Sequence, residues 1–231
     1  MKKAVIVLHQ ERSISGDIGK KLIKRGFFLE IIRPCLGEVL PKNLEDYSLV
    51  VVLGGPISVN DKDLYIKYEI NWLKSVIESE VPFLGICLGA QMLAKHLGCQ
   101  VRKNFNNFSE IGFFNITPTK EGKKIFKDQT IFYQFHDEGF DVPNNCKLLA
   151  TGDKFKFQAF KYKNCYAFQF HPEVDFYTHL RWLYFVIISK PKKLFDKGAQ
   201  NIFIQLYYRL KYNKKISLWL DNFLDNYLIK N

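Results

Sequence analysis

The chain has 231 residues, 47% of them hydrophobic, so it is long enough to bury one sizeable core and of a length typical of one domain. Its five cysteines are irregularly spaced, which excludes a disulfide framework and a C-x-x-C zinc motif, and their odd number favours a reducing compartment. Apolar stretches are too short to span a membrane, whereas a net charge of +11 keeps nucleic acid among the partners to be considered.

The first third of the chain alternates short apolar runs with helical patterns. The predicted strands are 4–8, 28–32 and 49–53, and the predicted helices are 18–25 and 63–79. The first apolar run is too short for a secretory leader, so we expect a strand there instead. This alternation predicts a parallel sheet covered by helices on both faces. The third run ends in a Gly-Gly-Pro turn at Gly54, where a backbone N–H can face a developing oxyanion.

A fourth predicted strand, 83–85, leads into Gly85-Ile86-Cys87-Leu88-Gly89, which has the G-x-C-x-G pattern of a nucleophile elbow. A helical pattern at 90–97 follows it. Such an elbow presents the thiol of Cys87 at the carboxyl edge of the sheet, where the helix N-terminus favours the thiolate. The alternative is a buried cysteine without a catalytic role, and the two flanking glycines argue against it.

After Gly98 the segments become short, aromatic and alternating, which predicts an added antiparallel patch. Strand-like segments lie near 101 and at 112–116, 148–151, 157–162 and 166–170. The last of them ends in His171-Pro172-Glu173. An imidazole at this strand end can reach a thiol at the end of another strand, and a carboxylate two residues on can orient it.

The C-terminal segment is strongly basic. From Leu180 to Asn231 there are ten Lys or Arg against three Asp or Glu, so this segment holds +7 of the net charge. Its aromatic residues, interleaved with lysines, could stack nucleic-acid bases. Their three- and four-residue spacing favours helical packing instead. The predicted face comprises Ile202, Leu206, Leu210, Ile216, Trp219, Leu220, Phe223 and Tyr227.

Three motifs together, G-G-P, G-I-C-L-G-A-Q and F-H-P-E, resemble the class I (triad-type) glutamine amidotransferases. The resemblance is closest to free-standing members similar to the amidotransferase domain of GMP synthase. It implies an α/β fold with a flavodoxin-like, mostly parallel sheet, helices on both faces and a small antiparallel addition. We expect an amidotransferase domain at 1–190 and a basic, aromatic helical extension at 191–231 that packs on the same domain.

The resemblance, taken position by position, also implies the site residues. Cys87 would be the nucleophile, His171 the general base and Glu173 the orienting carboxylate. The backbone amides of Gly55 and Leu88 would form the oxyanion hole. The substrate-binding positions would be Gly54, Gln91, Glu110 and Ile111.

The implied activity is release of ammonia from L-glutamine through a γ-glutamyl thioester on Cys87, with the ammonia supplied to a separate synthase. An alternative is a γ-glutamyl hydrolase or peptidase acting on a γ-glutamyl conjugate, which would use the same triad. A cysteine peptidase of the related elbow-bearing fold is disfavoured because its histidine follows the elbow closely. A non-catalytic binding module is disfavoured because all three triad positions are present.

The expected ligand is therefore L-glutamine or another γ-glutamyl compound. We expect neither nucleic acid nor a membrane as a partner. The sequence has no G-x-G-x-x-G or Walker-type loop and no His, Cys and acidic residues at metal-ligand spacing, so we expect no cofactor and no metal. The expected location is cytoplasmic.

Overall fold

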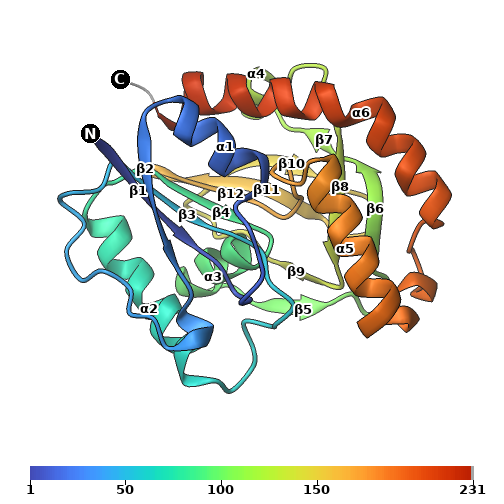
Figure 1. Cartoon of the computed structure of the whole chain (residues 1–231), viewed down its shortest axis with the longest axis horizontal. Coiled ribbons are helices and arrows are strands. Elements are labelled where there is room, and N and C mark those ends of the chain that lie inside the picture. The colour runs from blue at the N-terminus through green and yellow to red at the C-terminus, as the bar shows by residue number, and fades with distance from the viewer. Residues whose placement is uncertain (230–231) are drawn as a thin grey trace.

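The computed structural model describes residues 1–229, which form an eight-stranded sheet between two helical layers (Figure 1). The strand order is β2–β1–β3–β4–β12–β11–β10–β7, and the first five strands run parallel. These strands are β1 (Lys2–Val7), β2 (Phe27–Ile32), β3 (Leu49–Val52), β4 (Phe83–Ile86), β7 (Thr117–Pro118), β10 (Lys147–Thr151), β11 (Phe157–Tyr162) and β12 (Cys165–Phe168). The α-helices are α1 (Gly16–Lys24), α2 (Leu64–Glu78), α3 (Leu88–His96), α4 (Lys123–Phe126), α5 (Phe176–Ser189) and α6 (Ile202–Phe223).

Strand β3 shows why the parallel sheet forms. Its four residues are all aliphatic and all fully buried, as a strand needs when both faces of its sheet are covered. Leu49 and Val51 belong to the core shared with α1 and α6, whereas Val50 and Val52 belong to the core shared with α2 and α3. Figure 1 shows the same arrangement, with α1 and α6 above the sheet and α2 and α3 below it. The predicted fold class is confirmed.

The antiparallel part is more divided than the sequence predicted. Instead of forming one patch, β11, β10 and β7 extend the main sheet beyond β12. Two further pairs stand apart from it, β5 (Val101–Lys103) with β9 (Glu138–Phe140) and β6 (Glu110–Asn115) with β8 (Ile131–His136). Alternation of aromatic residues indicates a strand but does not identify its neighbour, so the sequence did not separate these pairs.

The strand that precedes the histidine also ends earlier than predicted. Strand β12 ends at Phe168, not at residue 170. Gln169 still donates its backbone N–H to the carbonyl of Gln158 on β11, at 2.8 Å, and two residues later the backbone N–H of His171 donates to the carbonyl of Tyr133 on β8, at 2.8 Å. His171 therefore sits between the main sheet and the β6–β8 pair.

The second half of α6 packs as the helical spacing predicted. Trp219, Leu220 and Phe223 are buried in the core on the α1 side of the sheet. The ring of Trp219 stacks on Phe126 of α4, with centroids 5.6 Å apart and an interplanar angle of 4°. Its indole N–H donates to the carbonyl of Ile125, at 2.9 Å.

For the first half of α6 the predicted face was wrong. Ile202, Leu206 and Leu210 are not among the buried side chains, and Leu210 is 71% exposed. The helix instead buries two polar side chains, Gln205 and Arg209. Hydrophobic spacing misplaced this face because the helix turns an amide and a cation inward. Gln205 donates to the carbonyl of Gln200 and Arg209 to that of Val174, while Nη2 of Arg209 is buried without a hydrogen-bond partner within residues 1–229.

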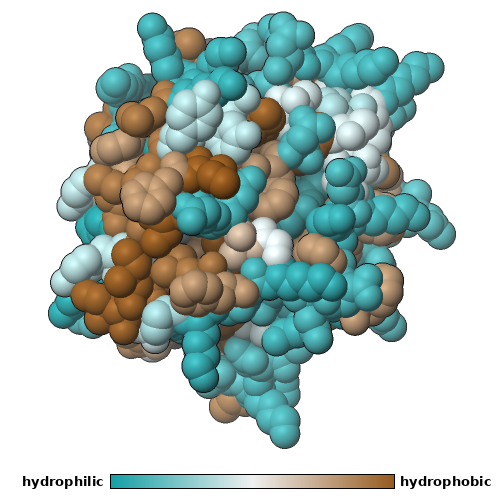
Figure 2. Space-filling model, turned by 90° about the vertical axis from the view of Figure 1, so that its right-hand side faces the viewer, coloured by the Kyte–Doolittle hydropathy of each residue, from teal (hydrophilic) through white to brown (hydrophobic). Residues whose placement is uncertain are grey.

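Exposed apolar side chains gather around α5. Figure 2, which shows the side of the molecule that carries α5, has a brown patch on its left-hand part. The exposed aliphatic and phenylalanine side chains of α5 are Phe176, Leu180, Phe185, Ile187 and Ile188, and those at the start of α6 are Phe203 and Ile204. Within residues 1–229, no helix is both long enough and apolar enough to cross a membrane.

We expect Trp219→Ala to lower the free energy of unfolding by about 3–5 kcal/mol, because it removes a buried aromatic ring and a buried hydrogen bond. Tyr207→Ala is the matched control, since Tyr207 lies on the same helix and is 59% exposed. It should change the free energy of unfolding by less than about 0.5 kcal/mol. Urea unfolding curves of the three proteins test this, and equal losses in both variants would contradict it.

Candidate active site

Cys87 occupies the turn between β4 and α3. Its φ of 52° and ψ of −103° lie in a region that non-glycine residues rarely adopt, as is typical of a nucleophile elbow. The backbone on both sides holds this turn. The Cys87 N–H donates to the Phe168 carbonyl at 2.7 Å, and the Cys87 carbonyl accepts from the Gln91 N–H at 2.9 Å. The elbow is thus tied to β12 on one side and to the first turn of α3 on the other.

The two glycines of the motif allow the helix to approach the sheet. A methyl group at Gly89 would collide with the carbonyl of Val52 on β3, and one at Gly85 would lie 2.6 Å from the carbonyl carbon of Gly89. Any side chain at either position would push α3 away from the sheet. The G-x-C-x-G spacing is therefore a packing requirement of this turn.

His171 and Glu173 form a buried pair beside the elbow. Nδ1 of His171 lies 2.8 Å from Oε1 of Glu173, and both side chains are almost fully buried. The imidazole packs edge-on against Trp182 of α5, with ring centroids 4.9 Å apart. The ring also lies close to the elbow, with Gly54 beside both. A methyl group placed at Gly54 would lie 2.7 Å from Cε1 of His171 and 3.4 Å from Cβ of Cys87.

The surroundings of His171 favour its charged form. Burial by itself lowers the pKa of the imidazole. The Glu173 carboxylate and the hydrogen-bonded Cys87 thiol outweigh burial and raise the pKa of His171 to about 10. The site can therefore hold a protonated imidazole next to sulfur at neutral pH.

One cavity of about 990 Å³ opens over this group. The sequence-predicted residues that line it are Gly54, Gly55, Cys87, Leu88, Gln91, Ile111, His171 and Glu173. Glu110 lies outside the lining, and its carboxylate instead accepts from Nε2 of Gln158 at 2.9 Å and lies 3.1 Å from Nε2 of His136. The fold thus gathers eight of the nine predicted site residues at one opening and places Glu110 in a buried network behind them.

The structure adds a residue that the sequence analysis missed. Gln169 is fully buried, and its Nε2 donates to the sulfur of Cys87 at 3.7 Å. Its Oε1 accepts from Nε2 of Gln91 at 3.3 Å, and that same nitrogen donates to the carbonyl of Glu138 at 3.0 Å. The sequence does hold one sign of this role, because Gln169 is a glutamine in an otherwise apolar segment two residues before His171.

Charged residues stand at the mouth of the cavity. Nζ of Lys193 lies 2.9 Å from Asp137, and Oγ of Ser58 donates to Glu138 at 2.7 Å. Burial raises the pKa of Asp137, but its hydrogen bond to Lys193 and the charges of Lys193 and Lys103 together outweigh this and leave the pKa below its ordinary value. All four residues line the cavity. They join the β8–β9 turn to the segment after α5 and to the Gly-Gly-Pro loop.

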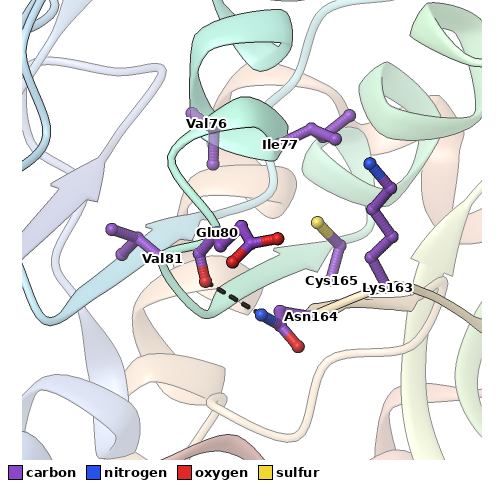
Figure 3. Close-up of a pocket in the computed structure, with 7 residues that line it drawn as sticks. All are labelled: Val76, Ile77, Glu80, Val81, Lys163, Asn164 and Cys165. Carbon is purple, nitrogen blue, oxygen red and sulfur yellow. Dashed lines mark hydrogen bonds between the residues drawn. The ribbon is translucent and has the colours of Figure 1, made fainter.

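A second cavity, of about 240 Å³, lies at the opposite, amino-terminal end of β4 and β12. Figure 3 shows Cys165 in its wall beside Asn164, whose side-chain nitrogen donates to the carbonyl of Glu80 at 2.9 Å. Burial raises the pKa of Cys165 to about 12, so its thiol is a poor nucleophile. No group of three or more His, Cys, Asp or Glu residues within 1–229 could hold a metal ion.

A family model described as glutamine amidotransferase class-I matches residues 6–187. Among curated proteins, the glutamine-hydrolysing GMP synthase of Campylobacter hominis is 30% identical over 177 residues, which cover 74% of this chain and 33% of that protein. A GMP synthase of Campylobacter jejuni is also 30% identical, over 76% of this chain and 34% of its own length. The chain therefore spans about a third of the length of these relatives.

Solved structures of similar proteins agree with this match. A glutamine amidotransferase from Thermotoga maritima superposes with a TM-score of 0.89 at 29% identity, and the alignment covers 99% of both chains. A glutamine amidotransferase from Methylobacillus flagellatus shares the fold with a TM-score of 0.87 at 21% identity, over 96% of this chain and 92% of that one. With a family match over most of its length and the elbow, histidine and glutamate around one cavity, the chain belongs to the class I glutamine amidotransferases.

Proposed function

We propose that this chain hydrolyses the side-chain amide of L-glutamine and releases ammonia. The observation that carries the proposal is the placement of the Cys87 thiol, the His171–Glu173 pair and the Gly54-Gly55 turn around one cavity. A nucleophile, a base and an orienting carboxylate in this arrangement are the groups that acyl transfer requires. Membership of the family supports the same activity.

In the first half-reaction His171 carries the proton of the Cys87 thiol as an imidazolium, and the sulfur of Cys87 attacks the side-chain carbonyl carbon of glutamine. As the sulfur–carbon bond forms, the carbonyl electron pair moves to oxygen, where the amides of Gly55 and Leu88 donate to it. The carbonyl then re-forms and the carbon–nitrogen bond breaks. The nitrogen takes its proton from His171 and leaves as ammonia, while a γ-glutamyl thioester stays on Cys87.

In the second half-reaction the same imidazole removes a proton from water, which attacks the thioester carbonyl. The sulfur leaves with a proton from His171, so glutamate is released and the thiol is restored. Glu173 supports both halves because its carboxylate fixes the imidazole through Nδ1 and stabilises its charged form.

A γ-glutamyl hydrolase is the second candidate, and the size of the cavity favours it. At about 990 Å³ the cavity lies at the upper end of the range for small-molecule sites and exceeds what one amino acid fills. The additional space could hold the rest of a γ-glutamyl conjugate. The chemistry at Cys87 would be unchanged, with a different amine as the leaving group.

We further propose that the ammonia passes to a separate synthase and that the protein acts in the cytoplasm. The similarity of this chain to about one third of two glutamine-hydrolysing GMP synthases supports a division of labour of this kind. The exposed apolar side chains of Phe185 and Ile188 border the cavity, so a partner receiving ammonia there would meet an apolar surface. The five cysteines are all unpaired, and a reducing compartment would keep the thiol of Cys87 free.

We expect Cys87→Ala to lower glutamate release from free glutamine by at least about 10³-fold, because no thioester can form. Glu173→Ala should leave partial activity, since the imidazole stays but loses its orienting partner. Cys165→Ala is the matched control, because it removes a buried thiol at the opposite end of the sheet and should keep the wild-type rate. Coupled assays of glutamate and ammonium measure all four proteins, and a wild-type rate in Cys87→Ala would refute the assignment.

The choice between the two candidates can be tested with two substrates and one label. Free glutamine should give glutamate, whereas Cys87-dependent cleavage of γ-glutamyl p-nitroanilide alone would favour the hydrolase. A glutamine-like diazo ketone should label Cys87 if the pocket accepts glutamine. Burial raises the pKa of the other four thiols, so they should stay unlabelled in peptide mass spectra; these are Cys35, Cys99, Cys146 and Cys165.

We expect Glu173→Gln to lower the pKa of His171 by more than about one unit, because the carboxylate raises that pKa against the effect of burial. In the wild-type protein the imidazole should lose its proton near pH 10. The raised pKa stabilises the fold fully below about pH 6.5, and this contribution is lost as the pH rises toward 10.

Nitrogen NMR of histidine-labelled protein measures this titration. His179 is the internal control, because burial and the nearby Arg209 guanidinium lower its pKa to about 3 and should keep it neutral above pH 5. An unchanged His171 titration in Glu173→Gln would show that the carboxylate does not set the charge of the imidazole.

A further inference from the structure

A second buried histidine–carboxylate pair lies behind the Gly-Gly-Pro turn. His9 follows β1, and its Nε2 lies 3.0 and 3.2 Å from the two carboxylate oxygens of Glu69 on α2. Both side chains are 0% exposed. Neither residue takes part in a step of the proposed glutamine hydrolysis.

Such a pair is costly in this place. The surrounding layer between the sheet and α2 is built from aliphatic side chains such as Val52, Ile66 and Leu88. Removing an imidazole and a carboxylate from water has a desolvation cost that their hydrogen bonds only partly offset. Nδ1 of His9 is moreover buried without a hydrogen-bond partner within the described residues. An apolar pair of similar volume would fill the same space at lower cost, which points to a role beyond packing.

The contacts of His9 indicate that role. A methyl group at Gly55 would lie 2.6 Å from Cβ and 3.1 Å from Cγ of His9, and 3.2 Å from Cδ2 of Leu88. The backbone of Gly55 is therefore enclosed between Cβ and Cγ of His9 on one side and the Leu88 side chain on the other. Gly55 and Leu88 are the two residues whose amides are assigned to the oxyanion.

Glu69 is well placed to fix the ring from the other side. It belongs to the middle of α2, a helix held at both flanks by side-chain hydrogen bonds. Trp72 donates its indole N–H to the carbonyl of Pro41 at 2.8 Å, and Nδ1 of His96 on α3 lies 2.8 Å from the carbonyl of Ile70. A displacement of the Glu69 carboxylate would thus require the helix to move.

We propose that His9 and Glu69 are positioning residues that set the spacing of the two oxyanion amides. Glu69 holds the His9 ring, the ring holds Gly55 against Leu88, and the distance between the Gly55 and Leu88 N–H groups follows from that stack. This inference rests on the proposed glutamine hydrolysis. Because an oxyanion forms only during the reaction, the pair acts on turnover and leaves ground-state binding of glutamine unchanged.

The test compares Glu69→Ala with the conservative variant Glu69→Gln. Loss of an oxyanion donor costs about 10²–10³-fold in kcat, so a displaced donor in Glu69→Ala should cost about 10-fold, with KM for glutamine within about 2-fold of wild type. Glu69→Gln keeps an oxygen that can accept from Nε2 of His9 and should stay within about 3-fold in kcat. Glu69→Gln also keeps the test valid if Glu69→Ala folds poorly, because the glutamine side chain has nearly the same volume as the glutamate side chain.

A glutamine analogue with a γ-aldehyde provides a second readout. The Cys87 thiol adds across its carbonyl, so a sulfur–carbon bond forms and the oxygen faces the two amides. Glu69→Ala should bind this aldehyde about 10-fold more weakly, whereas its affinity for glutamate, which forms no such adduct, should not change. Glu78→Ala is the matched control, because it removes another carboxylate of α2, whose side chain is 65% exposed and pairs with Lys74 at the far end of the helix.

A measurement on the resting protein separates this proposal from the proposed function. The amide resonance of Gly55 in a ¹⁵N-labelled protein should shift in Glu69→Ala and stay in place in Glu78→Ala, whether or not glutamine is hydrolysed. An unshifted Gly55 resonance overturns the positioning role, and so does an unchanged kcat in Glu69→Ala. Absence of Cys87-dependent glutamate release in the wild type would instead overturn the proposed function.

Discussion

The close approach of α3 to β3 and β4 is the constraint on which the rest of the site depends. It exists because the backbone at Gly85 and Gly89 carries no side chain where the helix meets the sheet. Only with the helix this close can the backbone of Cys87 make the sharp turn from β4 into α3, with a φ of 52°. The cost of that conformation is met by the packing of the helix on the sheet and by the hydrogen bond from Cys87 to β12.

The strand order converts this local turn into a site. Strands β3, β4 and β12 are neighbours and run parallel, so their carboxyl ends lie at one edge of the sheet. The Gly-Gly-Pro turn, the elbow and the histidine segment each follow one of these ends. A chain of buried hydrogen bonds then supports the elbow. Gln169 donates to the sulfur of Cys87, and Gln91 donates both to Gln169 and to the carbonyl of Glu138. The site is thus the meeting point of three strand ends and a chain of amide contacts.

Much of this could be predicted from sequence because the elbow is a local requirement. The spacing of Gly85, Cys87 and Gly89 specifies the turn, and a histidine after another buried strand can reach it only if the two strands end together. Residues that act through tertiary contacts left no comparable pattern. His9 and Glu69 are 60 residues apart, and nothing in the sequence around either shows that they meet. Gln169 stands out as a polar residue in a segment that reads as an aromatic strand, but nothing in that segment shows that it contacts the sulfur of Cys87.

In the C-terminal helix, too, a buried polar residue escaped prediction from the sequence, and this residue supports the turn at Glu173. Arg209 of α6 is almost completely buried, and although burial lowers the pKa of its guanidinium to about 10, the group stays charged at neutral pH. Its charge faces the rings of Phe113 and Tyr133, 4.9 and 5.2 Å from their centroids, and one nitrogen donates to the carbonyl of Val174 at 2.5 Å. Val174 directly follows Glu173, so this cation helps to fix the turn that carries the carboxylate.

The charge of the C-terminal segment is therefore partly internal. Besides Arg209, Lys193 is committed to Asp137 and Asp196 at the cavity mouth, so neither cation is free to meet a phosphate backbone without breaking an existing contact. Trp219 and Phe223, which interleave with the lysines in sequence, are buried against the sheet and cannot stack on bases while the helix is packed. At these positions, the basic and aromatic residues that suggested nucleic acid as a partner instead hold the C-terminal helix in place and fix the turn at Glu173.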